Sequence, residues 1–423
     1  MILITKPAVS PLRSLPTRFL LVLLILAGLL LPLAGGAQVS FLAVTTPVGS
    51  GFNTPYGMAV DSNGNVFLAD YNNQAVYEIV ASNGVVSSTS PVATLAAPSG
   101  GYSQPVSVAV DKFGDVFVAD AGTANAVYEI VAVNGVVNGN SVVKKLPGLT
   151  SATYPNDLAV DASGDLFIVY PQLPALLEIV ASGGTISPTS PIIALPAPSG
   201  GWMQPAGVKV DGSGDVFVAD QGWNALFEIP AAGGYTAVNM IDASTNGAAA
   251  LAVDRNGNVF FVGNFDTLLY EVEASGGYTT VDLLAAGFSG GNYFGMAVDG
   301  HGNIFVADAA NSVVNEIPLD LVNFGSQAVG SPSAPISLPF NISANGATTI
   351  GSVAILTTGS SGMDFIDAGS STCVAGTYPG NTNCVVNVSF APVASGLRRG
   401  AVVFYDGSGN VLATVPISGV GTG

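Results

Sequence analysis

One short motif recurs six times along this chain, at nearly constant intervals. It reads Val-Asp-x-x-Gly-(Asn/Asp), followed by an apolar residue and then by Phe. A pattern that returns every 43 to 50 residues is typical of a supersecondary unit that buries its apolar faces against copies of itself. The aspartates of the six copies are Asp61, Asp111, Asp161, Asp211, Asp254 and Asp299.

The motif describes a tight hairpin turn. A short Asp carboxylate caps backbone donors of the turn, and Gly takes the positive φ that costs other residues roughly 1–2 kcal/mol. In the first copy, apolar stretches at 58–60 and 66–69 flank the turn, and further strands are expected at 75–80 and 92–96. Four short strands, repeated six times, predict an all-β chain whose main domain is a six-bladed β-propeller.

The two ends of the repeat array predict how the ring closes. The last repeat stops at Ile317 without a fourth strand, whereas an extra apolar stretch, residues 39–46, precedes the first repeat. We therefore expect the N-terminal strand to close the last blade and so remove an open sheet edge. On this interpretation the propeller covers residues 38–318.

Residues 57–70 read Gly-Met-Ala-Val-Asp-Ser-Asn-Gly-Asn-Val-Phe-Leu-Ala-Asp. This stretch resembles the core of the NHL-repeat family, and the resemblance recurs six times over about residues 38–318. It implies a six-bladed propeller of a kind that commonly acts in interactions. The sequence departs from the family pattern at Tyr170 and Gly263, where the closing Asp is missing, so we expect unusual upper loops in blades three and five.

Beyond the repeats the chain becomes rich in Ser, Gly and Thr, with short apolar stretches. About 100 residues of this kind predict a β-sandwich over residues 319–423. The segments 321–326, 384–392 and 417–421 are similar to bacterial relatives of the ASPM–hydin type of immunoglobulin-like domain. That resemblance implies an immunoglobulin-like sandwich.

Residues 1–37 have the pattern of a secretory signal peptide. Three basic residues precede an apolar run at 19–33, and small residues follow at 34–37, which suits cleavage there. The run is shorter than the roughly 20 residues that a spanning helix needs. We expect an exported chain, periplasmic, on the cell surface or secreted, with no membrane span after signal removal.

Export also bears on the cysteines. The chain has two, Cys373 and Cys384, both in the predicted sandwich and 11 residues apart. In an oxidising compartment such a pair predicts a disulfide, worth about 2–3 kcal/mol. A metal pair or free thiols are the alternatives.

The charge balance excludes some partners. The chain carries 28 acidic and 10 basic side chains, and removal of the signal peptide leaves 7 basic against 28 acidic ones, a net charge of −21. Such a surface repels phosphate backbones and anionic lipid. We expect no nucleic acid partner, and a monomer.

The titratable residues give no catalytic constellation. The one histidine, His301, is expected to be a solvated turn residue, which argues against a zinc site or a Ser-His-Asp triad. Each motif turn offers calcium two or three oxygens where it needs six to eight, so we expect turn capping, no metal and no cofactor; a divalent metal held by several blades in the central channel stays open. A glutamate recurs in every third strand, which favours a structural role: Glu78, Glu129, Glu178, Glu228, Glu271 and Glu316.

One charged residue breaks the pattern of the innermost strands. Lys209 occupies a column that is otherwise alanine, and a cation there needs an acidic partner. We count it as a candidate binding residue, with a paired or snorkelling lysine as the alternative. The alanines of the column are Ala59, Ala109, Ala159, Ala252 and Ala297.

The loops that enter each first strand and those that follow each second strand open on one face of a propeller, here called the upper face. Aromatic and amide residues gather in these loops, and exposed aromatic planes beside amides suit sugar rings or peptide backbones. The alternative is that the aromatic rings only plug the blade tops. The candidate binding residues are Phe52, Tyr71, Asn72, Tyr102, Trp202, Trp223, Asn224, Phe265 and Tyr293.

These observations favour an exported, non-enzymatic binding or scaffold protein that recognises a glycan or a protein or peptide ligand with one propeller face. The first alternative is a metal-dependent lactonase or lyase similar to the gluconolactonases, whose propellers use channel carboxylates and a divalent metal. The second is a purely structural protein of the cell envelope. Fold alone does not decide among the three.

Overall fold

The computed structural model contains strands and turns, and no helix, in the part of the chain that it describes. Within that part, no helix has the length and apolar character needed to cross a bilayer. The predicted signal peptide, residues 1–37, lies outside it. The described residues are 38–41, 46–123, 125–146, 154–242, 245, 247, 250–263, 268–274, 277–278, 281–286, 293–317, 322–343, 348–357, 360–361, 363–379 and 382–423.

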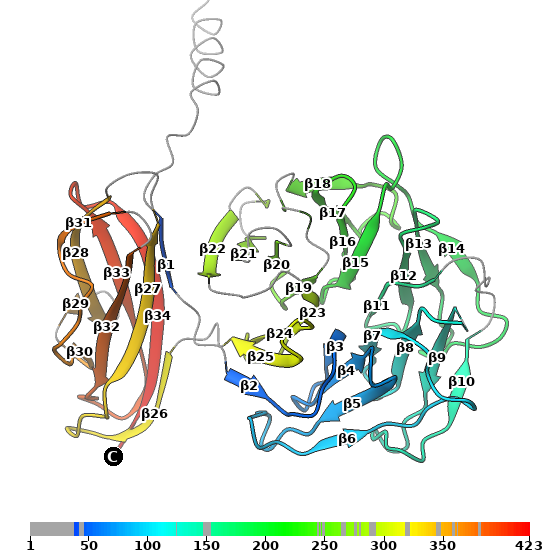
Figure 1. Ribbon diagram of the computed structural model, residues 1–423, viewed down its shortest axis with the longest axis horizontal. Coiled ribbons are helices and arrows are strands. Elements are labelled where there is room, and N and C mark those ends of the chain that lie inside the picture. Colours follow the sequence, from blue (N-terminus) through cyan, green and yellow to red (C-terminus); the bar gives the residue numbers. More distant parts are fainter. Residues whose placement is uncertain are drawn as a thin grey trace, which may run out of the picture.

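Six four-stranded antiparallel sheets form the propeller (Figure 1). Within each sheet, sequential strands pair as neighbours, from the innermost strand outwards. The first three blades are β3 (Pro55–Val60), β4 (Val66–Asp70), β5 (Ala75–Ile79) and β6 (Val92–Thr94); β7 (Pro105–Val110), β8 (Val116–Asp120), β9 (Ala126–Ile130) and β10 (Val143–Lys145); and β11 (Asp157–Val160), β12 (Leu166–Tyr170), β13 (Ala175–Ile179) and β14 (Ile192–Ala194).

The second half of the ring follows the same plan. Blade six takes its outermost strand, β2, from the N-terminal segment. The strands are β15 (Pro205–Val210), β16 (Val216–Asp220), β17 (Ala225–Ile229) and β18 (Asn239–Asp242); β19 (Leu251–Val253), β20 (Val259–Val262), β21 (Leu268–Val272) and β22 (Val281–Ala286); and β23 (Tyr293–Val298), β24 (Ile304–Asp308), β25 (Val313–Ile317) and β2 (Thr46–Val48).

The ring is closed, as the sequence predicts. The innermost strands contact one another in chain order, β3 to β7, β11, β15, β19 and β23, and β23 returns to β3. At the seam, β2 pairs antiparallel with β25, with Val48 opposite Val314. The N-terminal strand therefore closes the last blade.

The closing strand is shorter than expected. We predicted that the stretch 39–46 would supply it, but only its last residue belongs to β2, which spans Thr46–Val48. The preceding strand, β1 (Gln38–Phe41), pairs instead with a strand of the C-terminal domain. Apolar character alone cannot tell which of two sheet edges a strand will join, so the predicted domain boundary at residue 38 misassigned these four residues.

The recurrent motif makes the expected capped turn. In blade one, Oδ1 of Asp61 accepts hydrogen bonds from the backbone N–H groups of Asn63 and Asn65, both at 2.9 Å. The other five motif aspartates accept the same pair of bonds. In blade two, Gly114 has a φ of 86°, and a Cβ there would lie 2.7 Å from the carbonyl oxygen of Gly135. Both conformation and space therefore require glycine.

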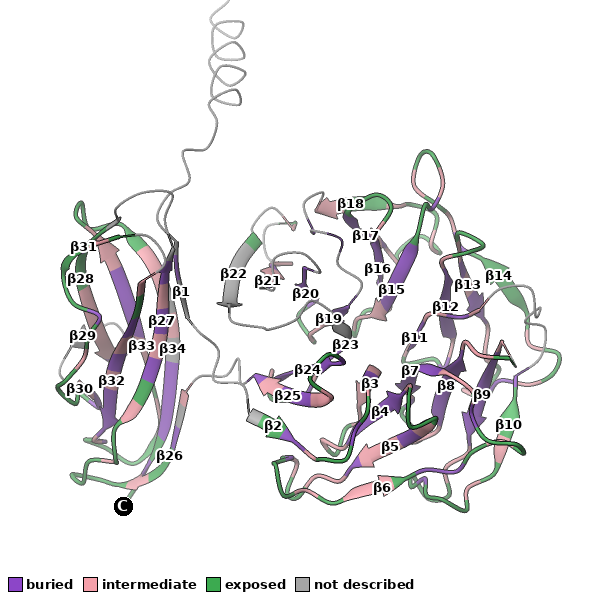
Figure 2. Cartoon of the chain, viewed as in Figure 1, coloured by how far each residue is buried: buried purple, intermediate pink, exposed green. Residues whose placement is uncertain are grey.

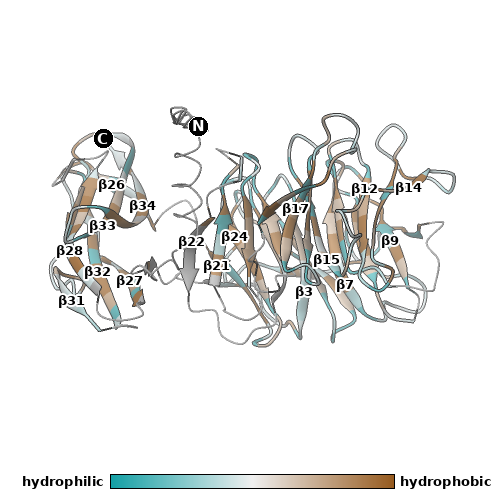
Figure 3. Ribbon diagram, turned by 90° about the horizontal axis from the view of Figure 1, so that it is seen from above, coloured by the Kyte–Doolittle hydropathy of each residue, from teal (hydrophilic) through white to brown (hydrophobic). Residues whose placement is uncertain are grey.

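The core lies between neighbouring blades. The motif phenylalanines are buried, and each joins an apolar cluster shared with an adjacent sheet; Phe67 of blade one packs with Val108 and Val116 of blade two. Figure 2 shows the buried residues concentrated in the inner strands, and Figure 3 shows apolar residues along the strands of both domains. This packing explains why the central strands are apolar on successive residues.

The C-terminal domain is a β-sandwich of two sheets. Aromatic side chains dominate its core, where Phe340 lies 4.5 Å from Phe404 between ring centroids. One sheet has the order β1, β27, β32, β30, and the other β26, β34, β33, β28, β29, with β31 also on β28. The strands are β26 (Val322–Ala328), β27 (Ile336–Ser343), β28 (Thr348–Thr357), β29 (Ser360–Ser361), β30 (Phe365–Asp367), β31 (Gly376–Tyr378), β32 (Thr382–Phe390), β33 (Gly396–Asp406) and β34 (Val411–Thr422).

The predicted disulfide is confirmed. Cys373 and Cys384 are bonded, with their Cα atoms 5.0 Å apart, and both are buried in the sandwich core. The bond joins the segment after β30 to strand β32.

Candidate functional site

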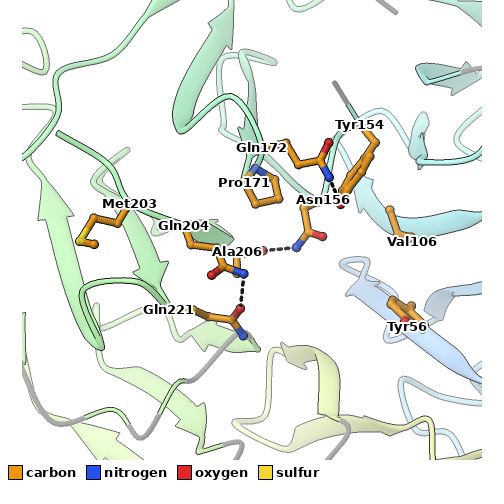
Figure 4. Close-up of a pocket in the computed structure, with 10 residues that line it drawn as sticks. All are labelled: Tyr56, Val106, Tyr154, Asn156, Pro171, Gln172, Met203, Gln204, Ala206 and Gln221. Carbon is orange, nitrogen blue, oxygen red and sulfur yellow. Dashed lines mark hydrogen bonds between the residues drawn. The ribbon is translucent and has the colours of Figure 1, made fainter. Parts of the chain in front are cut away.

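A pocket of about 430 Å³ opens on the upper face of the propeller (Figure 4). We call it the upper-face pocket. Part of its wall comes from one repeated position, the residue that directly follows the proline at the entrance to each of the first four innermost strands. Blades one to four contribute Tyr56, Val106, Asn156 and Ala206, which lie 50 residues apart along the chain.

The rest of the wall comes from the upper loops of blades three and four. Blade three contributes Tyr154, Pro171 and Gln172, and blade four contributes Met203, Gln204 and Gln221. None of the ten lining residues is charged. The pocket is therefore a neutral site rich in amides and aromatic rings, in a chain of strongly acidic composition.

Pairs of polar side chains hold the pocket wall in place. In blade three, the side-chain amide nitrogen of Gln172 donates a hydrogen bond to the hydroxyl of Tyr154 at 2.6 Å. In blade four, Gln204 donates to Oε1 of Gln221 at 3.3 Å. Asn156 donates across the blade boundary to the carbonyl oxygen of Ala206 at 2.6 Å. These contacts are drawn in Figure 4.

The upper loops of most blades are fastened by a buried aspartate at the end of the second strand. Asp120 of blade two accepts bonds from the backbone N–H groups of Ser103 and Gln104, at 3.0 and 2.7 Å. Asp70 and Asp220 fasten the loops of blades one and four in the same way. Burial without a charged partner would be costly, but backbone donors compensate these carboxylates.

Blade three has Tyr170 at this position. The ring is buried and packs among apolar residues, its hydroxyl has no hydrogen-bond partner in the described structure, and burial raises its pKa. The loop is held instead by the Tyr154–Gln172 pair. The upper loop of blade three therefore makes the same turn as those of blades one and four, but it is held differently, and it forms one wall of the pocket. In blade five, the loop after Gly263 lies outside the described residues.

A polar network ties blades two, three and four together next to the pocket. Asp157, which follows the pocket residue Asn156, is buried and forms an ion pair with Lys209, whose Nζ lies 2.7 Å from Oδ2. Its carboxylate also accepts bonds from the Ser107 hydroxyl at 2.6 Å and from the Val208 backbone N–H at 2.9 Å. The predicted acidic partner of Lys209 is confirmed, and Lys209 itself does not line the pocket.

Three of the predicted binding aromatics are buried, so the expectation that they present open planes is wrong. The exposed fractions of Phe52, Tyr102 and Trp202 are 8%, 3% and 7%. Each ring packs against an aromatic residue of the third strand of its own blade, as Trp202 does against Phe227. A large apolar ring gains more from closing the gap between blades than from exposure on a loop.

Other candidates lie on the upper face but outside the pocket wall. Tyr71 is half-buried and stacks on the pocket residue Tyr56, with centroids 5.0 Å apart. Asn72 is exposed and donates to the Thr54 hydroxyl at 2.6 Å. Trp223 is 39% exposed, and its indole N–H donates to a backbone carbonyl oxygen at 2.8 Å. These contacts give Asn72 and Trp223 structural partners.

Of the remaining candidates, one stabilises a loop, and two have side chains that lie outside the described part of the chain. Asn224 has a φ of 54° and accepts a hydrogen bond from the backbone N–H of Gly247 through Oδ1. Phe265 lies outside the described residues, as does the side chain of Tyr293, whose backbone belongs to β23. Our sequence analysis missed Tyr56, Tyr154, Asn156 and the pocket glutamines. They lie in or beside the same loops, but not at the loop positions where aromatic residues were singled out.

The residues that could carry acid–base or metal chemistry are elsewhere. No group of three or more His, Cys, Asp or Glu side chains in the described ranges could hold a metal. His301 has a side chain that is 62% exposed, as expected for a turn residue. The recurrent glutamates lie opposite the motif phenylalanines in the strand register, and burial followed by repulsion from Asp299 raises the pKa of Glu316 to about 6.

No protein-family model and no curated protein matches this sequence. Solved structures with a similar fold include a catalytically inactive virginiamycin B lyase from Staphylococcus aureus with quinupristin, at 11% identity and a TM-score of 0.47, covering 67% of this chain and 99% of that one. A gluconolactonase from Xanthomonas campestris has 14% identity and a TM-score of 0.46, with coverages of 67% and 90%. At this level the likeness carries no functional inference, and the β-propeller assignment rests on the strand order and ring closure.

Proposed function

We propose that this chain is an exported, non-enzymatic binding protein whose upper-face pocket holds an uncharged polar ligand, a glycan or a peptide. The observation that carries the proposal is the composition of the pocket: two tyrosines and four amide side chains, with no charged residue, around about 430 Å³. Ligand sites are typically concave, with a few placed polar groups among apolar ones.

The support of the pocket fits a binding role. The Tyr154–Gln172 and Gln204–Gln221 pairs fix polar groups before any ligand arrives, and the Asp157–Lys209 pair ties the blades on either side. A wall that is ordered in advance loses less entropy on binding. The β-sandwich, of immunoglobulin-like type on the sequence resemblance, serves as a spacer or a second contact, and we expect the protein to act as a monomer outside the cytoplasm.

The test uses the mature chain, beginning at residue 38, on glycan and peptide arrays, followed by titration calorimetry with each retained compound. Asn156→Ala and Gln172→Ala, both in the pocket wall, should weaken binding about tenfold each, since one lost hydrogen bond of about 1.4 kcal/mol corresponds to that factor. Asn72→Ala is the matched control, an exposed amide on the same face outside the pocket. Equal weakening by all three variants would place the ligand elsewhere.

The same preparation distinguishes the alternatives that the sequence leaves open. If the purified protein holds a stoichiometric divalent ion tightly and hydrolyses a lactone, the lactonase or lyase function replaces the proposed binding function. If the protein is retained on no array and shows no activity, the hypothesis that remains is a purely structural protein of the cell envelope.

A further inference from the structure

Three amide side chains of the pocket keep hydrogen-bonding groups that no described residue uses. Asn156, Gln172 and Gln204 each donate one bond through the side-chain nitrogen. Their side-chain carbonyl oxygens accept no bond from any described residue, and each nitrogen retains a second N–H. Each amide therefore presents one acceptor beside one donor toward a ligand.

We infer that the ligand is a neutral carbohydrate, an inference that rests on the proposed function. A hydroxyl group both donates and accepts, so two adjacent hydroxyls of a sugar match the free oxygen and free N–H of one amide. The rings of Tyr56 and Tyr154 and the apolar surface of Pro171 suit the faces of sugar rings that carry C–H groups.

Two competing ligand classes fit less well. The common modes of peptide recognition use a sheet edge, a long groove or a cluster of arginines, whereas the lining residues described here form a compact, uncharged hollow. Acidic sugars would meet a chain with 28 acidic and 10 basic side chains, whose field repels anions.

The decisive experiment titrates the mature chain with three probes of similar size: cellotriose as the neutral sugar, trigalacturonic acid as the acidic one, and an end-blocked tripeptide. We expect binding of the neutral trisaccharide only, weakened about tenfold by Gln172→Ala and unchanged by Asn72→Ala. Binding of the tripeptide alone would overturn this inference and leave the proposed function standing. Binding of the acidic sugar alone would overturn both, because the proposed ligand is uncharged. Failure of every probe and of the arrays would overturn both.

The first two strands of the chain carry an independent inference, because they belong to different domains. β1 lies at the edge of a sandwich sheet, where Val39 pairs with Ile342 and is buried in the sandwich core. β2 follows β1 after four intervening residues. It lies at the edge of blade six, where Val48 is buried among residues of blades six and one. A single segment of 11 residues, 38–48, thus completes a sheet in each domain.

The other connection between the domains is equally short. Residues 318–321 join β25 to β26, and residues 42–45 join β1 to β2. Each link of four residues can span at most roughly 18 Å between the strands that it joins. The two links also start from paired strands, since β2 and β25 are neighbours in one sheet.

We propose that strands β1 and β2 together form a latch that makes the propeller and the sandwich unfold as one cooperative unit. Displacing β1 exposes the edge of β27 and removes one of the two links. The sandwich is then tied to the propeller only through residues 318–321 and unfolds independently.

Differential scanning calorimetry of the mature chain tests the latch. We expect one transition for the unaltered protein, and two for Val39→Asp, with the sandwich transition at the lower temperature. Pro47→Asp is the control: it adds the same charge to the same segment at an exposed position and should keep one transition. Val39→Ala, a milder change, should lower the single transition or begin to split it.

Fluorescence of the two tryptophans, Trp202 and Trp223, reports the propeller alone, because the chain has no others. In Val39→Asp we expect the tryptophan signal to follow only the upper transition. Two separate transitions in the unaltered protein, or identical profiles for Val39→Asp and Pro47→Asp, would overturn the latch.

Discussion

Blades three and four are neighbours built on the same repeat, yet their upper loops are held in different ways. In blade four, the fully buried carboxylate of Asp220 accepts four backbone hydrogen bonds, at 2.9–3.1 Å, from Met203, Gln204, Gly222 and Trp223. That loop is therefore held by a buried group that does not line the upper-face pocket.

In blade three, Tyr170 fills the same position and accepts none of these bonds. Side chains on top of the loop, Tyr154 and Gln172, hold it instead. The comparison teaches that two blades can supply neighbouring parts of one pocket wall by different means: blade four through a buried carboxylate, and blade three, which lacks it, through polar side chains on the loop itself.

The largest effect is expected from removing the cap of blade four. Asp220→Ala leaves four backbone N–H groups of the loop without their acceptor, and should lower the free energy of unfolding by about 3–4 kcal/mol. Urea denaturation of the mature chain measures it. Tyr170→Phe is the matched change in blade three: because its hydroxyl has no partner, stability should stay constant or rise by up to about 1 kcal/mol. Similar losses of unfolding free energy in both variants would show that the two loops are not held in different ways.

The ion pair between these blades should come next. Lys209→Met leaves the Asp157 carboxylate without its cation in a site where the Asp157 side chain is only 12% exposed, and should cost about 3 kcal/mol. The double variant Asp157→Gly with Lys209→Ala restores the small residues found at these positions in other blades. It should recover most of that loss in the same denaturation assay; a double variant no more stable than Lys209→Met would contradict the assignment.

A smaller effect separates structural from binding aromatics. The indole N–H of Trp223 donates to the Gly201 carbonyl, and in blade one the side-chain amide of Asn73 donates to the equivalent Gly51 carbonyl. Trp223→Asn should therefore keep this bond and cost less than Trp223→Ala, by about 1 kcal/mol. Both variants should bind ligand as the unaltered protein does. If the Trp223 variants lose ligand binding but not stability, Trp223 is part of the binding site and this prediction is wrong.

The smallest effect is a pH dependence that contrasts blades six and two. Burial holds the pKa of Glu316 near 6, above its ordinary value of 4.5. Burial also raises the pKa of its counterpart Glu129, but there Lys144, at 3.6 Å, acts in the opposite direction. The folded protein then binds the Glu316 proton more tightly than the unfolded chain, so this residue's contribution to stability falls as pH rises from about 4.5 through 6. Denaturation of Glu316→Gln between pH 4 and 7 should show a flatter profile than the unaltered protein, and an identical profile would refute the shift.

Regular spacing made most of the fold predictable. The six capped turns, the closed ring, the sandwich and the disulfide all follow from residues whose roles are local: an Asp cap, a positive-φ Gly, two nearby cysteines. The pairing of β1 with β27 was missed because it joins residues about 300 positions apart, and no local pattern chooses between two open edges.

The site was only partly predictable. Sequence periodicity indicated the face on which the pocket opens, the missing aspartate of blade three and the need of Lys209 for an acidic partner. It could not tell a buried ring from an exposed one: Trp202 is 7% exposed in an apolar cluster shared by blades three and four, whereas Trp223 is 39% exposed. The pocket glutamines gave no signal because amides are ordinary on loops.

The described chain starts and finishes in the same domain, since Gln38–Phe41 and Val411–Thr422 both belong to the sandwich. A fluorophore attached at β1 or at β34 would therefore report on the sandwich, and a surface attached at either strand would hold the molecule by the sandwich rather than by a blade.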